Sequence, residues 1–390
     1  DLEATLFSGQ SFRWTKHNSQ FVGVLGSDVV VLTYLTGETG GGGSAKLSLN
    51  PRVIFRRLNT VKASSSNEEM RMEQSRLDLI DDRLHSYFNA NVDVQALLSS
   101  WRRTDENFEK KSDQFHGLRT LRVDTLEAII SFICSSNNNI PRISMMVERL
   151  CAMFSENHID ATSMQVHYRF PTLSQLTMVT EKQLRQAGFG FRAPKLVAAV
   201  RQMVALGGDE WLRSLERPDL AREPARELLQ QLSGVGPKVA DCVCLCSLQK
   251  HDAIPVDTHC WQLARRDYLP ELAPAASLTT KRYAQIGDYF RDHFGPYAGW
   301  AFMVLFAAEL SLFKRAARAR QDENVQQALA VAQQPVATRR VSGFFRRGAT
   351  ELLLVNKGGG SEVDDDVGVE PRAQHQHRHD FMAWKRRKRG

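Results

Sequence analysis

A single lysine stands where a helix is expected to begin, directly after a glycine-rich turn, in the segment LSGVGPKVADC (232–242). Pro237 is typical of a first helical turn, so Lys238 would lie at the positive end of the helix macrodipole, where acidic residues are usually preferred. This dipole and partial burial both disfavour the ammonium form, and together they predict a lowered pKa for the Lys238 amine. An uncharged amine is a nucleophile, so the sequence indicates covalent catalysis by Lys238.

The turn before Lys238 also predicts an anion-binding site. The segments on either side, EPARELLQQL and PKVADCVCLCSL, have the apolar spacing of helices, and Gly234 and Gly236 are expected to supply positive φ angles between them. The first backbone N–H groups of the second helix would point outward together and bind a phosphate of DNA. On these features alone, an ordinary turn between two helices remains open.

A carboxylate lies 19 residues after the lysine, in IPVDTHCW (254–261). Asp257 is placed to cap a helix that begins at Thr258. A carboxylate held there can stabilise positive charge that develops on a sugar ring, as carboxylates do in glycoside hydrolysis. Asp257 alone would be a plain N-cap, but its pairing with Lys238 predicts a second catalytic residue.

Two kinds of region would position these side chains. Residues 11–35 alternate strand-like segments with turns, which predicts an antiparallel β meander within a small N-terminal domain, 1–115. Glycine- and serine-rich segments at 36–45 and 61–75 are predicted to be flexible insertions in that domain. Nearly every later segment has helical spacing, which predicts a helical domain over 116–313. The expected fold class is therefore α+β.

The charge of the chain is concentrated at its end. The net charge is +7, and residues 311–390 hold 16 Lys or Arg against 9 Asp or Glu, so residues 1–310 are balanced. The composition of 314–390 cannot bury a core and predicts a disordered basic tail. KRRKR (385–389) is typical of a nuclear-import or nucleic-acid-binding segment, although a solubilising tail has the same composition. No apolar run has the length of a membrane helix, and we expect no membrane contact.

The six cysteines do not predict a metal site. They are few for 390 residues and lack the spacing of secreted disulfide frameworks, which indicates an intracellular protein. Cys242, Cys244 and Cys246 alternate along an expected helix, where successive residues turn by about 100°, so Cys244 would point away from the other two. No second ligand pair follows at zinc spacing, and we expect no metal.

Several longer segments together resemble one protein family. The sequence is similar to the helix–hairpin–helix DNA glycosylases, and most of all to the 8-oxoguanine DNA glycosylases, over roughly 300 residues. The family fold implies a TBP-like antiparallel β domain followed by two helical lobes with the active site between them. The segments that carry the resemblance are SGQSFRW (8–14), SFICSSNNNIPRI (131–143), GFGFRAPK (188–195), GVGPKVADC (234–242), IPVDTHCW (254–261) and GPYAGWAFMVLF (295–306).

The resemblance implies a bifunctional DNA glycosylase and AP lyase that needs no cofactor. Lys238 would attack C1′ of a flipped nucleotide, expel the base and form a Schiff base, and β-elimination would then cleave the strand. Asp257 would stabilise the charged sugar. The implied partner is double-stranded DNA that contains an oxidised purine, and the implied state is a monomer. We expect a nuclear location; the chain begins at Asp1 rather than Met, so residues are expected to precede it and mitochondrial targeting is left open.

The same resemblance assigns the surroundings of the flipped base. Asn137 would fill the vacated place in the duplex and Phe191 would wedge beside it, while Arg142 and Arg192 would read the orphaned cytosine, whose acceptors suit guanidinium donors. The residues implied to contact the base are Gly9, Cys242, Phe302 and Phe306. Those implied to hold the DNA backbone are Gly234, Gly236, Val239 and His259.

One residue departs from the family pattern. Phe302 stands where the family usually has a glutamine that hydrogen-bonds the guanine pairing edge, and a phenyl ring can neither donate nor accept there. The loss of such a bond predicts relaxed base selectivity, with activity on ring-opened formamidopyrimidines. A glycosylase with shifted base specificity is therefore an alternative.

Other classes of protein share parts of this pattern. Iron–sulfur glycosylases carry four closely spaced cysteines after the aspartate helix, whereas only Cys260 follows here, and monofunctional alkyl-base glycosylases lack the lysine. A non-catalytic DNA-binding protein would use the hairpin only to hold phosphates. In a second non-enzymatic alternative, the basic tail binds RNA or a partner on a degenerate core.

Overall fold

The structure is a computed structural model that describes residues 1–34, 53–58, 67–159, 166–272 and 277–315. They belong to one compact unit that extends over 1–332. The predicted insertion at 36–45 and all but the first two residues of the predicted tail, 314–390, lie outside the described residues. The predicted boundary at residue 115 stays a prediction.

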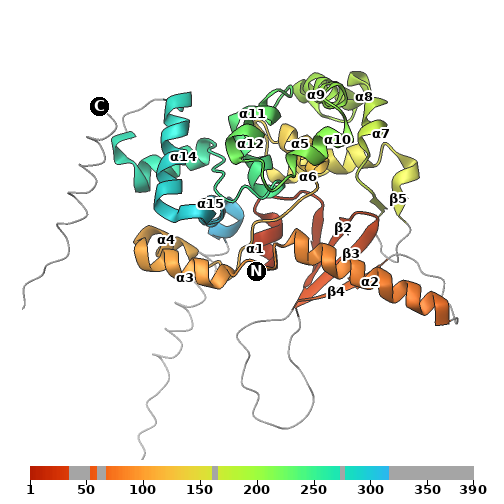
Figure 1. Cartoon of the computed structure of the whole chain (residues 1–390), viewed down its shortest axis with the longest axis horizontal. Coiled ribbons are helices and arrows are strands. Elements are labelled where there is room, and N and C mark those ends of the chain that lie inside the picture. The colour runs from red at the N-terminus through yellow and green to blue at the C-terminus, as the bar shows by residue number, and fades with distance from the viewer. Residues whose placement is uncertain (35–52, 59–66, 160–165, 273–276, 316–390) are drawn as a thin grey trace, which may run out of the picture. The chain divides into compact units, whose positions relative to one another are not determined.

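The predicted β meander is confirmed. After α1 (Leu2–Phe7), strands β1 (Trp14–His17), β2 (Gln20–Leu25), β3 (Asp28–Tyr34) and β4 (Val53–Arg57) form an antiparallel sheet in chain order (Figure 1). The β-branched run of β3, Val29 to Val31, is buried, as suits a strand in the interior of a sheet.

The prediction of a flexible insertion over 61–75 is wrong for its second half. Helix α2 (Asn67–Tyr87) already begins at residue 67, because the glutamates, methionines and glutamines of this stretch are strong helix formers. Ion pairs also fix the helix to the sheet: Arg57 in β4 contacts Glu73 at 2.9 Å, and Arg76 contacts the buried Asp28 at 3.0 Å. The serines that precede the helix, within residues 63–66, led to the prediction of a flexible segment that extends too far.

The later part of the described chain is mainly helical, as predicted. A short two-stranded sheet, β5 (His158–Ile159) with β6 (His167–Tyr168), was not predicted. The helices after α2 are α3 (Val94–Thr104), α4 (Glu106–Ser112), α5 (Thr125–Cys134), α6 (Ile140–Cys151), α7 (Leu173–Thr177), α8 (Glu181–Gln186), α9 (Ala193–Ala205), α10 (Asp209–Leu215), α11 (Arg222–Gln230), α12 (Pro237–Cys246), α13 (Thr258–Leu263), α14 (Thr280–Phe294) and α15 (Ala298–Glu309). Short 3₁₀ or π-helical turns are η1 (Ser155–Asn157), η2 (Gly190–Arg192), η3 (Ala264–Tyr268), η4 (Pro270–Leu272) and η5 (Gly295–Tyr297).

Helix α5 lies at the centre of the helical part. All ten of its residues are buried except Glu127, and its N-cap Asp124 accepts a hydrogen bond from the Glu127 N–H at 3.0 Å. It packs against α6, α9 and α12. One hydrophobic core runs from Phe21 and Leu32 of the sheet to α15, so the two predicted parts share a single interior. Among the described helices, none could cross a membrane.

Candidate active site

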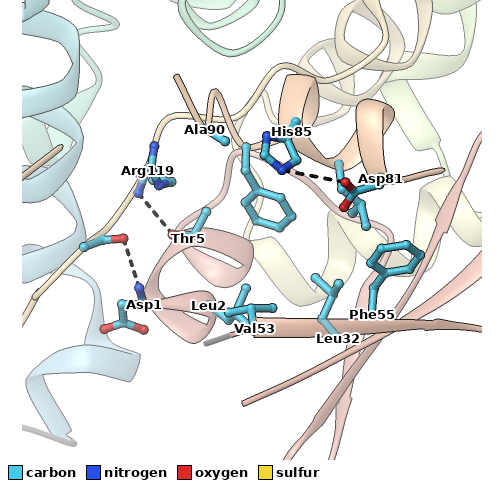
Figure 2. Close-up of a pocket in the computed structure, with 13 residues that line it drawn as sticks. Asp1, Leu2, Thr5, Leu32, Val53, Phe55, Asp81, His85, Ala90 and Arg119 are labelled. Carbon is cyan, nitrogen blue, oxygen red and sulfur yellow. Dashed lines mark hydrogen bonds and ion pairs between the residues drawn. The ribbon is translucent and has the colours of Figure 1, made fainter. Parts of the chain in front are cut away.

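Two cavities of the described chain differ in what lines them. A cavity of about 240 Å³ beside the N-terminus is walled by α1, β3, β4 and α2, and it contains none of the predicted site residues (Figure 2). A second cavity, of about 390 Å³, gathers seven of them. These seven are Gly9, Lys238, Cys242, Asp257, His259, Phe302 and Phe306.

A groove of about 850 Å³ adjoins the second cavity and shares Lys238, Asp257 and His259 with it. The exposed Asn137 and the hairpin turn line this groove. The hairpin residues there are Gly234, Val235, Gly236, Pro237 and Val239. The two predicted catalytic residues therefore lie where the second cavity meets the groove.

The hairpin is built as predicted, with one correction. Gly234 has a φ of +85°, and a Cβ there would lie 3.2 Å from the Lys195 Cβ, so the turn needs glycine at this position. Gly236 has a φ of −91° and open space beside it, so the predicted positive φ is wrong there. As the N-cap of α12, Gly236 needs only an extended backbone. The first intrahelical bond joins the Ala240 N–H to the Gly236 carbonyl at 3.0 Å, which leaves the Val239 N–H without a partner inside the helix.

Lys238 is half-buried at the start of α12, and its Nζ lies 5.7 Å from the centre of the Phe132 ring. Burial disfavours the ammonium form, but the neighbouring Cys242 sulfur and Asp257 carboxylate favour it more, and the balance raises the pKa of Lys238 above its ordinary value. The predicted lowering of this pKa is therefore wrong for the free protein. The sequence argument counted the helix dipole and burial, but not these two neighbours.

Asp257 caps α13, and its Oδ1 accepts a hydrogen bond from the Cys260 N–H at 2.9 Å, as predicted. Its carboxylate lines both the cavity and the groove. His259, two residues further, is exposed at the same edge. The cap fixes the carboxylate while leaving it at the cavity wall, which suits the stabilisation of a positive charge there.

The four residues predicted to contact the base all line the second cavity, and their role there stays a prediction. Gly9 has a φ of +85°, and a Cβ there would lie 3.2 Å from Ile140, which lines the same cavity. Phe302 is 1% exposed and packs edge-on against Phe290, with ring centres 5.0 Å apart. Phe306, one turn later on α15, is only half-buried and so presents its ring to the space. Burial raises the pKa of the Cys242 thiol, despite the opposing effect of the nearby lysine.

The predicted wedge and opposite-base residues come from the segment between α5 and α6, from α6 and from η2. Asn137 has a φ of +48°, a conformation that asparagine tolerates better than most residues. Arg142 is exposed in the first turn of α6, and Phe191 is 50% exposed. These three side chains are available to a ligand.

Arg192 differs from the expectation that it faces DNA. It is 2% exposed, its Nε donates to the Ser136 carbonyl at 3.2 Å, and its Nη2 donates to the Asn137 carbonyl at 2.9 Å. Its guanidinium also lies 4.3 Å from the centre of the Phe191 ring. In this structure Arg192 therefore fixes the Asn137 loop, and its guanidinium is not exposed to a ligand.

Sequence reasoning missed other residues of the cavity wall. Phe12 and Phe132 contact each other edge-on, with ring centres 5.8 Å apart, and both line the cavity. Glu309 at the end of α15 also lines it and forms ion pairs with Lys111 at 2.8 Å and Arg266 at 2.7 Å. Their partners come from distant segments, so no local pattern marks them. The position of Glu309 three residues after Phe306 was the one available signal.

The cysteines are not grouped with other metal ligands in the part of the chain that the structure describes. All six are free and buried. Within the described ranges, no three His, Cys, Asp or Glu side chains are grouped as metal ligands.

Comparisons with known proteins place this fold and site in a class. Residues 1–129 match the N-terminal domain of 8-oxoguanine DNA glycosylase, and residues 130–286 match the HhH-GPD superfamily of base excision DNA repair proteins. N-glycosylase/DNA lyase OGG1 of Arabidopsis thaliana is 37% identical over 313 residues, which cover 79% of this chain and 77% of that protein. N-glycosylase/DNA lyase of Saccharomyces cerevisiae is 37% identical over 257 residues, covering 60% of this chain and 67% of that protein.

Solved structures agree with these matches. The Clostridium acetobutylicum 8-oxoguanine glycosylase/lyase, in complex with double-stranded DNA containing cytosine opposite 8-oxoguanine, superposes with a TM-score of 0.62 at 26% identity. The match covers 79% of this chain and 90% of that one. Fold and site thus define a helix–hairpin–helix protein of base excision repair. Within that class, the chain belongs to the 8-oxoguanine DNA glycosylase family of bifunctional N-glycosylase/DNA lyases.

Proposed function

We propose that this protein removes 8-oxoguanine paired with cytosine from double-stranded DNA and then cuts the strand at the same nucleotide. The observation that carries the proposal is the cavity shared by Lys238, Asp257 and Phe306, which opens beside a groove that the start of α12 lines. The family of the chain and the DNA bound to the Clostridium protein support this substrate.

The first step is the entry of the flipped nucleotide. Extruding a base costs a few kcal/mol, and the exposed Asn137 and Phe191 are suited to fill the space that it leaves. The base would stack on Phe306. The carbonyl of Gly9 would accept a hydrogen bond from N7–H, which 8-oxoguanine has and guanine lacks. The backbone amides at the start of α12, with His259, would hold phosphates.

The chemical steps use side chains of the protein alone. The unprotonated Lys238 amine attacks C1′, the glycosidic bond breaks, and the base leaves with the bonding electron pair and takes up a proton. Asp257 stabilises the positive charge that develops on the sugar. The bound amine then loses a proton and the C1′–O4′ bond breaks, so that an iminium forms at C1′ and O4′ takes up a proton. Loss of a proton from C2′ then expels the 3′ phosphate by β-elimination, and water hydrolyses the remaining iminium to free the lysine.

Attack requires that Lys238 lose the proton that its raised pKa retains in the free protein. A base in the cavity would lie between the lysine and Cys242, because both residues line it. Separation from the sulfur removes an interaction that favours the ammonium, and the remaining burial favours the neutral amine. Substrate entry would thus itself activate the nucleophile.

Phe302 gives the proposed activity a second feature, relaxed base selectivity. Its buried ring lines the cavity where the family usually has glutamine, so it offers the base no hydrogen bond. We therefore include ring-opened formamidopyrimidines among the substrates.

Borohydride trapping tests the proposal. Wild-type protein and the Lys238→Gln variant are incubated with duplexes that carry 8-oxoguanine opposite each of the four bases. We expect a covalent adduct with wild type, strongest opposite cytosine, and none with the variant. Lys195→Gln is the matched control, since Lys195 lines the adjoining groove but not the cavity.

Two results would reject the proposal: binding of lesion DNA without excision, as for a non-catalytic DNA-binding protein, or an adduct that persists in Lys238→Gln. A chain truncated after residue 313 should keep excision; its loss there would favour the alternative in which the basic tail is the functional part.

We also propose that the protein acts as a monomer in the nucleus. The basic segment 385–389, outside the described residues, supports the location. Fluorescence of a tagged chain with and without this segment tests it, and an unchanged distribution would reject the role of the segment.

A further inference from the structure

A buried tyrosine hydroxyl lies between the two elements that carry the proposed catalytic residues. Tyr283 belongs to α14 and is 9% exposed. Its hydroxyl donates to the Asp241 Oδ2 at 2.5 Å and accepts a hydrogen bond from the Val256 N–H at 3.3 Å. Asp241 follows Lys238 by three residues on α12, and Val256 directly precedes Asp257. One hydroxyl therefore connects both catalytic segments.

The Asp241 side chain is itself held from a third helix. It is 4% exposed, and its Oδ2 lies 3.3 Å from the Nε of Arg226 in α11. The Arg226 guanidinium also lies 5.4 Å from the centre of the Tyr283 ring. Helices α11, α12 and α14 thus meet at one polar cluster, which we call the Tyr283 cluster: Arg226, Asp241, Tyr283 and the backbone of Val256.

Burial of the polar groups in the Tyr283 cluster costs folding free energy, which indicates that the cluster has a role besides packing. Burial raises the pKa of Asp241 to about 6, although the Tyr283 hydroxyl and the Arg226 guanidinium both oppose this shift. The Asp241 Oδ1 has no hydrogen-bond partner among the described residues. A leucine of similar volume would avoid both penalties. The cluster instead gives four separate segments one fixed relative position.

We propose that Tyr283 is a positioning residue that sets the separation between Lys238 and Asp257. This inference rests on the proposed function. Tyr283 lines neither the cavity nor the groove, so it acts only through Asp241 and Val256. The Lys238 amine and the Asp257 carboxylate belong to different segments, and both must lie close to the same sugar ring. A displacement of about 1 Å between reacting groups can cost on the order of 100-fold in rate.

Tyr283→Phe tests this inference, because it removes the hydroxyl and keeps the ring. We expect the single-turnover rate of 8-oxoguanine excision at saturating protein to fall by about 10- to 100-fold. The dissociation constant for a duplex with a non-cleavable 8-oxoguanine nucleotide should change by less than about threefold, because the DNA-facing residues are untouched. Tyr289→Phe, the same change on the same helix outside the cluster, should leave both values near wild type.

Several outcomes would overturn the inference. One is a Tyr283→Phe rate within threefold of wild type. Another is an equal loss in rate and in binding, or an equal loss in Tyr289→Phe, since either would indicate a general structural effect. Should Tyr283→Phe fail to fold, Asp241→Asn must show the same loss of rate at unchanged affinity. Absence of excision by the wild-type protein would instead reject the proposed function, so the two failures are distinguishable.

Discussion

The two cavities, one beside the N-terminus and one beside Lys238, differ in what their polar groups do. In the N-terminal cavity, Arg119 donates to the Asn89 carbonyl at 2.8 Å and to the Val92 carbonyl at 3.1 Å. The amine of Asp1 donates to the Gly117 carbonyl at 3.0 Å (Figure 2). These groups hold the backbone together. In the other cavity an amine and a carboxylate line open space beside aromatic rings. Space alone does not make an active site; polar groups that remain available within it do.

The largest effect on the excision rate should come from removal of the Asp257 negative charge at the second cavity. Asp257→Asn keeps a good N-cap for α13, so the fold should be retained. The neutral amide cannot stabilise a positive sugar, and we expect excision to slow by about 100- to 1,000-fold. Single-turnover kinetics at an unchanged melting temperature would measure this. A rate within tenfold of wild type would mean that Asp257 is only a cap.

A smaller effect should appear in base selectivity. Phe302→Gln restores a group that can hydrogen-bond the base, and one such bond contributes about 1–3 kcal/mol of discrimination. We expect the ratio of excision rates on 8-oxoguanine and on 8-oxoadenine, whose pairing edges differ, to rise by roughly 5- to 150-fold. Phe302→Leu, apolar and unable to form the bond, is the control. Strict 8-oxoguanine preference in the wild type would contradict the argument.

The pH dependence of excision should shift with Cys242. The Cys242 sulfur favours the ammonium form of Lys238, so Cys242→Ala should lower the pKa of that amine. The neutral fraction grows as the pH rises through this pKa. In the pH profile of kcat/KM, which reports the free protein, the midpoint of the rising limb should therefore move to lower pH in the variant, whatever its maximal rate. A midpoint that moves upward or stays fixed would exclude this coupling.

The smallest effect on activity should come from the N-terminal cavity. Leu84→Ala removes a buried side chain that lines it and should reduce the free energy of unfolding by about 2–4 kcal/mol. Excision should stay within about twofold of wild type, because no catalytic group lies there. Leu79→Ala, 49% exposed on the same helix, should cost less than about 1 kcal/mol. Loss of excision in Leu84→Ala at temperatures well below melting would give this cavity a role in the reaction.

Local signals predicted most of the framework. Asp257 marks a helix start through its own side chain and the next few residues, and this cap is present. The turn of six residues between α11 and α12 requires glycine at position 234, and the sequence of the turn alone predicted this. The pairing of Lys238 with Asp257 came from two such local patterns and a family resemblance.

Most of what failed or was missed depends on contacts between distant segments. The raised pKa of Lys238 depends on Cys242, four residues further along the same helix, and then on Asp257, 19 residues away. The burial of Arg192 depends on carbonyls 55 and 56 residues earlier. Tyr283 reaches Asp241 across 42 residues. No local pattern encodes such neighbours, because they arise only when the helices pack.

The buried position of Arg192 bears on its predicted contact with the opposite base, which stays a prediction. Its guanidinium already has acceptors in the main chain of Ser136 and Asn137. A base can recruit it only by outcompeting two carbonyl groups, and withdrawal of the arginine would release the Asn137 loop at the same moment. Contact of Arg192 with the opposite base and insertion of Asn137 into the duplex would then occur together. With an unsuitable opposite base, Arg192 would stay bonded to the two carbonyls and the Asn137 loop would not move.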